Sequence, residues 1–493
     1  MGSSLGLRGL PAEVLVLLAA ALPSSDFFHL RLASRDLRDK TAAVFHRRFF
    51  RKRCVSLERG SLQNLVDISR DPVLCQVVST VELCIDHLVH PRYYLSRQEL
   101  KEEKGIYDYA LETAQEDLGR LQTLQALGGG ERTIDTARST VLSVRDQSEG
   151  DRHAIDIAVG TGDRRAVNYN AYRQRWFEQL GFGGAGLDVA YLAAAFVNLR
   201  RCRAVGVNDF VRPWGTASLS RDLRFMPNRF ISSYIPESIP FASRVIRTLL
   251  SAVAASRLAL ERFYVTFGSM KESCTRVTPY MLTIPPVLMA EVGMQLAAVL
   301  DIHLLLDPEP SRTVGEAYAT GSSDWVAVLV RFLSLFAKLS QLVLAFEPRD
   351  RYGRFSRLSE TLYMPCLAVL RLECLDCTTP QLLCLLRRHK KTLRKVELES
   401  LTLTGDVIVT GGWSSVVRMA WNELMLDKLY LGDCGTDDTT MMVRNDICDE
   451  EEAWPRVFVA RGRAECLPLA ERLQGYEEIS RRRQSVVGRT VLQ

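Results

Sequence analysis

One glycine-rich segment has the spacing of a phosphate-binding loop. Gly181, Gly183 and Gly186 form a G-x-G-x-x-G pattern, in which backbone N–H groups at a helix N-terminus can hold the pyrophosphate of a dinucleotide. Such a loop must follow a β-strand. Residues 170–180 have the composition of a helix instead, so we expect a loop without a bound nucleotide.

Four cysteines and one histidine lie close enough in sequence to suggest zinc. Cys374 and Cys377 form a C-x-x-C pair, with Cys366, Cys384 and His389 nearby, and thiolate and imidazole are preferred ligands of Zn²⁺. The same segment also has the pattern of a strand followed by a helix, and one of the thiols falls inside the apolar run 382–386. We therefore expect core thiols and no metal.

The remaining composition favours a binding protein over an enzyme. The 493 residues include only seven histidines, and no G-x-S-x-G, H-E-x-x-H or P-loop motif is present, so we predict no catalytic activity and no cofactor. The net charge of +5 comes from basic residues that are spread out and mostly matched by acids, which argues against nucleic acid as a partner. Charged residues interrupt the long apolar windows, and the twelve cysteines are scattered. We expect no membrane span, reduced thiols, and a cytoplasmic and/or nuclear location.

The stretch from Leu10 to Lys40 has the pattern of short helices that must position whatever binds there. Pro11 and Glu13 suit a first helical turn, the pair at 22–23 (Leu-Pro) ends that helix, and residues 24–26 (Ser-Ser-Asp) offer a cap for the next. A third helix follows to about residue 45. Some forty residues are too few to bury these leucines and phenylalanines, so part of the surface must contact the rest of the chain or another protein.

This stretch resembles an F-box. The resemblance rests on Leu10-Pro11-x-Glu13-Val14-Leu15, then Leu22, then Asp26-Phe27-x-x-Leu30-Arg31-Leu32-x-Ser34-Arg35-x-Leu37-Arg38. It departs from the family at Leu37, where many members carry an aromatic residue. Two other interpretations remain open for this stretch, namely an amphipathic helical hairpin packed into its own domain and a secretory signal.

The resemblance implies that residues 1–50 dock on the Skp-type adaptor of a cullin-RING ubiquitin ligase. The implied adaptor-binding residues are Leu10, Pro11, Val14, Leu15, Leu18, Leu22, Phe27, Leu30 and Ser34. Residues 61–69 are predicted to form a helix and residues 77–85 a β-rich run. A similar run often opens the C-terminal domain of fungal F-box proteins.

Three further segments are predicted by composition. A capping box at 96–99 (Ser-Arg-Gln-Glu) begins a long amphipathic helix that ends at the glycines 128–130. Residues from about 131 to 170 are polar and weakly periodic, so we expect an insertion that is exposed and partly mobile. Residues 446–493 lack any repeat and are predicted to be a partly disordered tail.

From residue 187 the chain repeats an apolar helix followed by a strand of the form L-x-x-L-x-L. The predicted strands are Leu199-x-x-Cys202-x-Ala204, Leu260-x-x-Phe263-x-Val265, Leu339-x-x-Leu342-x-Leu344, Leu367-x-x-Leu370-x-Leu372, Leu393-x-x-Val396-x-Leu398 and Leu426-x-x-Leu429-x-Leu431. The last four begin 28, 26 and 33 residues apart, and the final one continues to Cys434 and Asp437 as in the cysteine-containing subtype of leucine-rich repeat. We predict the α/β class: a three-helix F-box, then an irregular α/β leucine-rich-repeat-like solenoid over 51–445. An unrelated α/β domain with chance matches remains an alternative.

If the leucines of each strand point inward, the residues between them project from the opposite face. These predicted target-binding residues are Arg262, Tyr264, Gln341, Arg371, Glu373, Lys395, Glu397, Glu399, Lys428 and Tyr430. The function we expect is the substrate-recognition subunit of a Skp-cullin-F-box ubiquitin ligase, whose target protein the sequence does not identify. The alternative is a scaffold protein whose F-box acts outside a ligase.

Overall fold

The structure is a computed structural model. It describes residues 7–89, 169–209, 238–267, 277–306, 325–350, 355–405, 412–436 and 457–461, with a few single residues between these ranges. The predicted long helix after residue 96 lies outside the described residues except for a few helical positions. The predicted insertion also lies outside them up to residue 168, and its last two residues begin helix α8 (Tyr169–Gly184).

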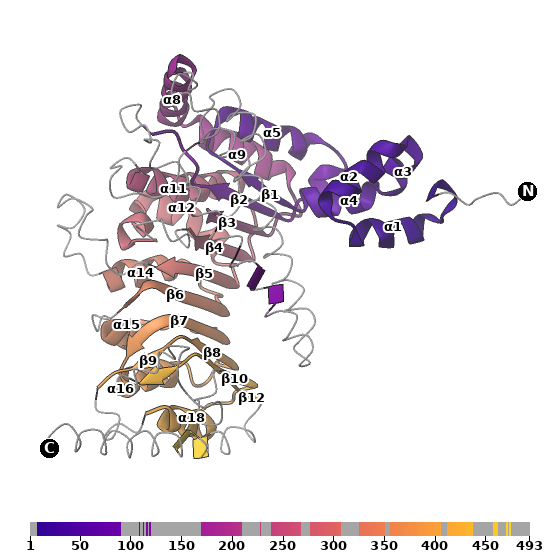
Figure 1. The fold of residues 1–493 in the computed structure, drawn as a ribbon. Coiled ribbons are helices and arrows are strands. Elements are labelled where there is room, and N and C mark those ends of the chain that lie inside the picture. The colour runs from indigo at the N-terminus through magenta and orange to yellow at the C-terminus, as the bar shows by residue number, and fades with distance from the viewer. Residues whose placement is uncertain are drawn as a thin grey trace, which may run out of the picture.

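The chain begins with a module of short helices that projects from one end of the molecule (Figure 1). Its elements are η1 (Leu7–Gly9), α1 (Ala12–Ala21), α2 (Ser24–Ala33), α3 (Arg35–Lys40) and α4 (Ala42–Phe50). The predicted third helix is therefore two helices. They separate at Thr41, whose backbone leaves the helical region and whose hydroxyl donates a hydrogen bond to the Leu37 carbonyl at 2.7 Å. The predicted cap at residues 24–26 is wrong, because α2 has no side-chain cap.

The rest of the described chain forms a 12-stranded sheet in which the strands follow one another in chain order (Figure 1). The strands are β1 (Lys52–Val55), β2 (Thr80–Cys84), β3 (Ala204–Asn208), β4 (Arg262–Thr266), β5 (Asp301–Leu306), β6 (Gln341–Asp350), β7 (Val369–Cys377), β8 (Lys395–Glu399), β10 (Lys428–Gly432), β12 (Val457–Arg461), and the short β9 (Thr402–Leu403) and β11 (Gly435–Thr436). All neighbours pair in parallel except β10 and β12.

Parallel neighbours need a crossover connection, and helices supply it. The described helices after the module are α5 (Arg59–Arg70), η2 (Leu74–Gln76), α8, α9 (Leu187–Asn198), α11 (Ser238–Ser256), η5 (Pro279–Leu282), α12 (Pro286–Leu296), α14 (Trp325–Leu333), α15 (Phe355–Thr361), α16 (Thr379–Arg388) and α18 (Gly412–Glu423). One continuous core joins their apolar faces to the inward side chains of the strands. The local sequence specifies the start of α16: Thr378 and Gln381 form a reciprocal capping box, and a proline occupies its first turn.

The strand register aligns one buried apolar position from strand to strand. These side-by-side residues are Val81, Val205, Phe263, Ile302, Leu342, Leu370, Val396 and Leu429. Five of the six predicted strands are confirmed. The first was misplaced, because Leu199 caps the end of α9 and β3 begins only at Ala204, where the predicted strand ends.

The predicted repeat strands do not include β1, β5 or β12. β5 carries the same spacing in Val299, Ile302 and Leu304, and β1 carries a buried arginine, Arg53, at the aligned position. The predicted tail needs a correction as well. β12 lies within it, and this strand extends the sheet by pairing antiparallel with β10, whereas most of residues 446–493 lie outside the described residues.

Candidate functional site

Helix α1 is apolar on two opposite sides. Leu15 and Ala19 are fully buried against the other short helices. Val14, Leu17, Leu18 and Ala21 recur at the i, i+3, i+4, i+7 spacing of one helix face, and all four are exposed; Leu17 is 72% exposed. We call these four residues the α1 stripe. An apolar helix face in water is costly, and in soluble proteins it usually marks a contact surface.

An aromatic cluster holds the short helices together. Phe27 and Phe28 of α2 pack against Phe45 and Phe49 of α4, with ring centroids 5.0–6.5 Å apart. The guanidinium of Arg31 lies 4.1 Å from the centroid of the Phe45 ring, within the range of a cation–π contact. The cluster packs α2 against α4. Because α1 contacts α4, the exposed face of α1 lies on a packed group of helices.

A second contact ties the turn after α1 to α4. Arg48 donates hydrogen bonds to the Leu22 carbonyl at 2.6 Å and to the Ser24 hydroxyl at 3.0 Å. These bonds satisfy a carbonyl at the C-terminal end of α1 that lacks a partner within the helix. The sequence prediction placed a helix cap among residues 24–26, and in the structure the Ser24 hydroxyl accepts a hydrogen bond from this arginine.

The nine predicted adaptor-binding residues differ in how far the structure exposes them. Pro11, Val14 and Leu18 are exposed, and Leu10, Leu22, Leu30 and Ser34 are half-buried. Leu15 and Phe27 are fully buried within the module, so their predicted contact with a partner is wrong. Ser34 caps α3 by accepting a hydrogen bond from the Leu37 N–H at 3.2 Å. Leu17 and Leu32, the latter 82% exposed, are surface leucines outside the predicted set.

The module joins the sheet through a buried arginine. Arg53 of β1 is almost fully buried, and its guanidinium lies 5.2 Å from the ring of Phe50 at the end of α4. It donates to the Phe49 carbonyl at 3.2 Å. Burial lowers the pKa of Arg53 to about 10, so the side chain remains charged at neutral pH. These contacts connect the end of α4, before residue 51, to the first strand, after it.

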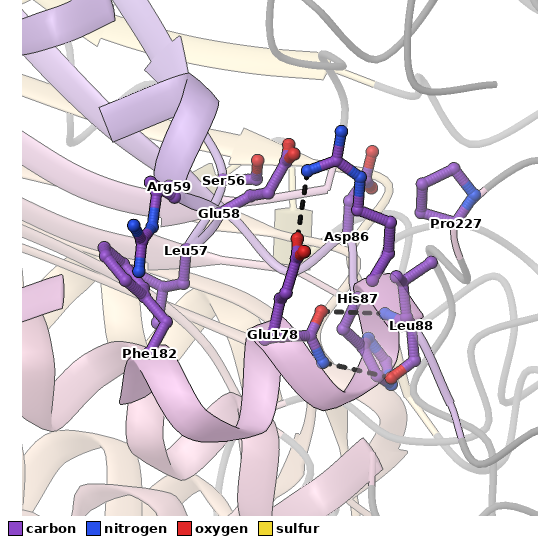
Figure 2. A pocket seen from close by; sticks show the side chains of 12 residues that line it. Ser56, Leu57, Glu58, Arg59, Asp86, His87, Leu88, Glu178, Phe182 and Pro227 are labelled. Carbon is purple, nitrogen blue, oxygen red and sulfur yellow. Dashed lines mark hydrogen bonds and ion pairs between the residues drawn. The ribbon is translucent and has the colours of Figure 1, made fainter. Parts of the chain in front are cut away.

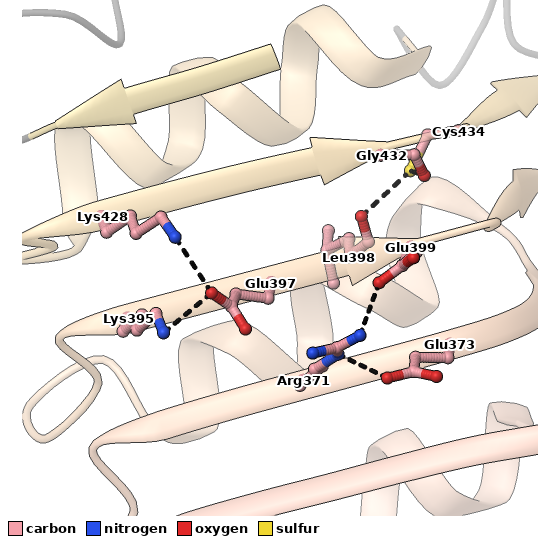
Figure 3. Close-up of polar contacts among 9 residues, drawn as sticks. All are labelled: Arg371, Glu373, Lys395, Glu397, Leu398, Glu399, Lys428, Gly432 and Cys434. Carbon is pink, nitrogen blue, oxygen red and sulfur yellow. Dashed lines mark hydrogen bonds and ion pairs between the residues drawn. The ribbon is translucent and has the colours of Figure 1, made fainter. Parts of the chain in front are cut away.

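The face of the sheet opposite the helices carries a charged cluster on β7, β8 and β10 (Figure 3). Arg371 forms ion pairs with Glu373 and, at 2.6 Å, with Glu399. Glu397 accepts from two lysines, Lys395 at 2.8 Å and Lys428 at 3.1 Å. We call these six residues, together with Tyr430, the charged ladder. Two of these ion pairs join residues two positions apart on one strand, and the other two join diagonal neighbours on adjacent strands. The diagonal partners separate like charges that the register sets opposite one another, Glu373 beside Glu399 and Lys395 beside Lys428.

The pairing sets the protonation of the ladder. Burial alone would raise the pKa of Glu397, but the hydrogen bonds from Lys395 and Lys428 outweigh burial and lower the pKa. Burial raises the pKa of Glu373 despite the neighbouring Arg371. For Arg371, the carboxylates of Glu373, Glu399 and Glu397 together overcome burial and raise the pKa.

Most of the predicted target-binding residues already pair with one another or with other residues of the chain. Seven of them make up the charged ladder. Gln341 lies on β6, between Asp301 and Val369 in the register. Arg262 on β4 pairs with Asp301 at 2.6 Å, and Tyr264 donates its hydroxyl to Glu82 of β2, where burial and that carboxylate raise the tyrosine pKa.

A small pocket of about 40 Å³ lies where the start of α5, the end of β2 and α8 meet (Figure 2). Its wall includes Glu58, and burial raises the pKa of this carboxyl group. The wall also includes the side-chain amide of Gln179, which accepts a hydrogen bond from the Leu88 N–H and donates one to the Leu88 carbonyl, both at 3.0 Å. His87 lies beside it, 2.8 Å from the Ile85 carbonyl and 3.1 Å from the Ser238 hydroxyl. Burial lowers the pKa of His87 to about 4, so it is neutral and serves as a structural bridge at physiological pH. A volume of this size admits water or a small ion.

The cysteine–histidine segment and the glycine-rich segment, which could have bound a metal ion and a nucleotide, contribute contacts within the fold. His389 receives the Met364 N–H on one ring nitrogen at 3.0 Å and contacts the Leu385 carbonyl with the other at 2.9 Å, so neither nitrogen faces a metal. Within the described residues, no group of three or more His, Cys, Asp or Glu side chains could hold a metal ion.

The glycine motif forms the last turn of α8 and the connection to α9. Gly186 adopts a positive φ of 68° at that connection. A Cβ at Gly183 would lie 1.4 Å from the guanidinium of Arg244, which pairs with buried Asp188 at 2.5 Å. The glycine therefore leaves space for an ion pair between α9 and α11, and the element that leads directly into the motif is helix α8, where a dinucleotide loop needs a strand.

No family model matches the chain, and no curated protein matches it significantly. Within the parts of the chain that the structure describes, no single helix is long and apolar enough to cross a membrane. One pair of helices, Ala171–Gly184 and Leu187–Asn198, reaches that length and composition only together, and it is bent by 69°.

Proposed function

We propose that the chain is the substrate-recognition subunit of a Skp-cullin-F-box ubiquitin ligase. In this proposal the helical module is an F-box that binds the Skp-type adaptor, and the sheet with its helices is an irregular leucine-rich-repeat-like solenoid that binds a target protein. The chain itself performs no bond chemistry. It raises the effective concentration of a target lysine near a ubiquitin carrier that the cullin holds.

The α1 stripe is the observation that carries the proposal. The stripe lies within the stretch that resembles an F-box, and its leucines are exposed although the module already buries Leu15, Ala19 and Phe27 inside. Among the described residues, no buried member of α1 to α4 belongs to the large core of the sheet. The module is thus a separate packed unit with one apolar side left over, as a docking element for another protein would be.

The arrangement of strands supports the repeat part of the proposal. In a repeat solenoid each unit contributes one strand and one covering helix, and each unit contacts mainly its neighbours. The strand order of this sheet follows the chain, the aligned apolar positions are buried, and helices separate successive strands over most of its length. Cys434, which ends the last predicted repeat, is buried and donates its thiol toward the Leu398 carbonyl at 3.5 Å.

Adaptor binding by stripe variants tests the first half of the proposal. Co-expressed Skp-type adaptor should co-purify with the wild-type chain, and Leu17→Asp should reduce its recovery at least about 30-fold, because a carboxylate would be buried against an apolar partner surface. Met294→Asp on α12 is the matched control, since Met294 is 80% exposed and distant in sequence. Equal recovery of the adaptor with both variants would contradict the F-box assignment.

Recovery of cullin tests the second half. If the chain is a ligase subunit, cullin should co-purify through the adaptor with wild type and with Met294→Asp, and it should be lost with Leu17→Asp. Adaptor without cullin, in all preparations, would instead indicate the scaffold role outside a ligase.

A further inference from the structure

Two cysteines meet on the first two strands, on the face away from the helices. Cys54 lies in β1 and Cys84 at the end of β2, and both alternate with residues of the main core such as Val55 and Leu83. Their sulfur atoms are 2.7 Å apart. Non-bonded heavy atoms usually stay about 3.5 Å or more apart, whereas a disulfide joins sulfurs at about 2.05 Å. The two thiols are therefore held closer than ordinary packing requires.

Bond formation requires one strand to move, and the position of Cys54 on an edge strand permits this movement. The register aligns Cys54 with Glu82, so Cys84 is its diagonal neighbour, and a disulfide requires β1 to shift toward the end of β2. β1 has only four residues, and β2 is its one partner in the described sheet. A short edge strand of this kind can move more easily than a strand that pairs on both sides.

We propose that Cys54 and Cys84 are a reversible oxidation site that forms an intrachain disulfide with hydrogen peroxide as oxidant. Cys54, which is 8% exposed against 0% for Cys84, reacts first. Its thiol gives up a proton, the thiolate sulfur attacks one peroxide oxygen to form a sulfenic acid, and the hydroxide that leaves takes up the proton as water. The Cys84 thiol then gives up its proton, and its thiolate attacks the Cys54 sulfur to form the S–S bond. The hydroxide that leaves takes up this proton as a second water, so two electrons pass from the two sulfurs to the peroxide.

The disulfide would lie at the joint between the helical module and the sheet. β1 begins two residues after α4 ends, and Arg53 beside Cys54 contacts Phe50. Closing the loop between residues 54 and 84 removes freedom from the unfolded chain. Oxidation should therefore raise the thermal midpoint of the protein by a few degrees, and reduction should reverse the shift.

Peptide mapping tests the proposal without depending on the adaptor or on the proposed function. The reduced full-length protein is treated under native conditions with hydrogen peroxide at about one to two equivalents, blocked with an alkylating agent, digested without reductant, and sequenced by tandem mass spectrometry. We expect a linked pair of peptides that joins Cys54 to Cys84 and disappears after reduction.

Matched variants separate this site from a chance linkage. Cys75→Ser is the control, because half-buried Cys75 lies in the same tryptic peptide as Cys84, and the cross-link should persist in it. Cys54→Ser and Cys84→Ser should each abolish the cross-link and the thermal shift. The proposal is overturned if wild-type protein shows only sulfinic or sulfonic acid at Cys54 with Cys84 unmodified, or if the cross-link forms only after denaturation. This readout on wild type decides the matter even if a serine variant fails to fold.

Discussion

The α1 stripe and the charged ladder are both surfaces, yet their side chains are in opposite situations. The stripe consists of apolar groups that face outward with nothing of the described chain to cover them. The ladder consists of charged groups that already neutralise one another at 2.6 to 3.1 Å. Covering the stripe releases water from apolar surface and is favourable by itself. A partner of the ladder must compete with existing ion pairs, so that face would contribute specificity more than affinity.

The largest effect on stability should be the difference between variants on the two sides of α1. Leu15→Asp places a charge in a fully buried position and should destabilise the helical module by about 4 kcal/mol or more. Leu17→Asp, two residues away on the stripe, should leave module stability within about 0.5 kcal/mol of wild type. Limited proteolysis should cut the Leu15→Asp chain within residues 10–50 while the sheet domain survives. Equal resistance of the two variants would show that the two sides of α1 are assigned wrongly.

Acid should weaken the sheet domain through His87. Its pKa is lowered to about 4 in the folded protein from 6.5, so between these values the unfolded chain binds the proton and the folded chain does not. The contribution of His87 to stability is then greatest above pH 6.5 and falls as the pH drops toward 4, by about 3 kcal/mol. Urea denaturation at pH 7, 5.5 and 4.5 measures this slope. His87→Gln, although destabilised overall, should show a flatter slope, and an unchanged slope would assign the pH dependence to other groups.

A smaller effect should come from the ladder. Arg371→Met removes the positive partner of Glu373 and Glu399 and should cost about 1 kcal/mol, a value kept low because the arginine side chain is 38% exposed. Lys395→Met is the matched control, since Lys428 still pairs with Glu397, and its cost should be close to zero. Chemical denaturation compares the two variants. Equal stability of both would mean that the ladder ion pairs carry no measurable stability, and neither change should alter adaptor binding.

The sequence predicts the existence of these surfaces better than their orientation. Pro11 and Pro23 mark the ends of α1, and leucine spacing locates most strands, because these signals act over a few residues. The side of α1 that faces inward could not be predicted, since residues 14–22 are apolar all round. β5 was missed because valine and isoleucine replace leucine at two of its aligned positions.

Contacts between distant parts of the chain were also beyond the sequence. Tyr264 bonds Glu82 from two strands away, and its ring crosses Gly206, where a Cβ would lie 2.2 Å from the ring. No local pattern connects residues 182 positions apart. The same reason explains why the contact of Cys54 with Cys84 and the ladder ion pairs between strands could not be predicted from spacing.

Amide hydrogen exchange with and without the Skp-type adaptor tests the central claim most directly. The wild-type chain with saturating adaptor should gain protection in the helical module, greatest in α1, while β7, β8 and β10 exchange as they do in the chain alone. The Leu17→Asp chain should show no such gain, and Met294→Asp should behave as wild type. Protection confined to the sheet, or no change in α1 in a complex that forms, would contradict the assignment of the α1 stripe as the adaptor-binding surface.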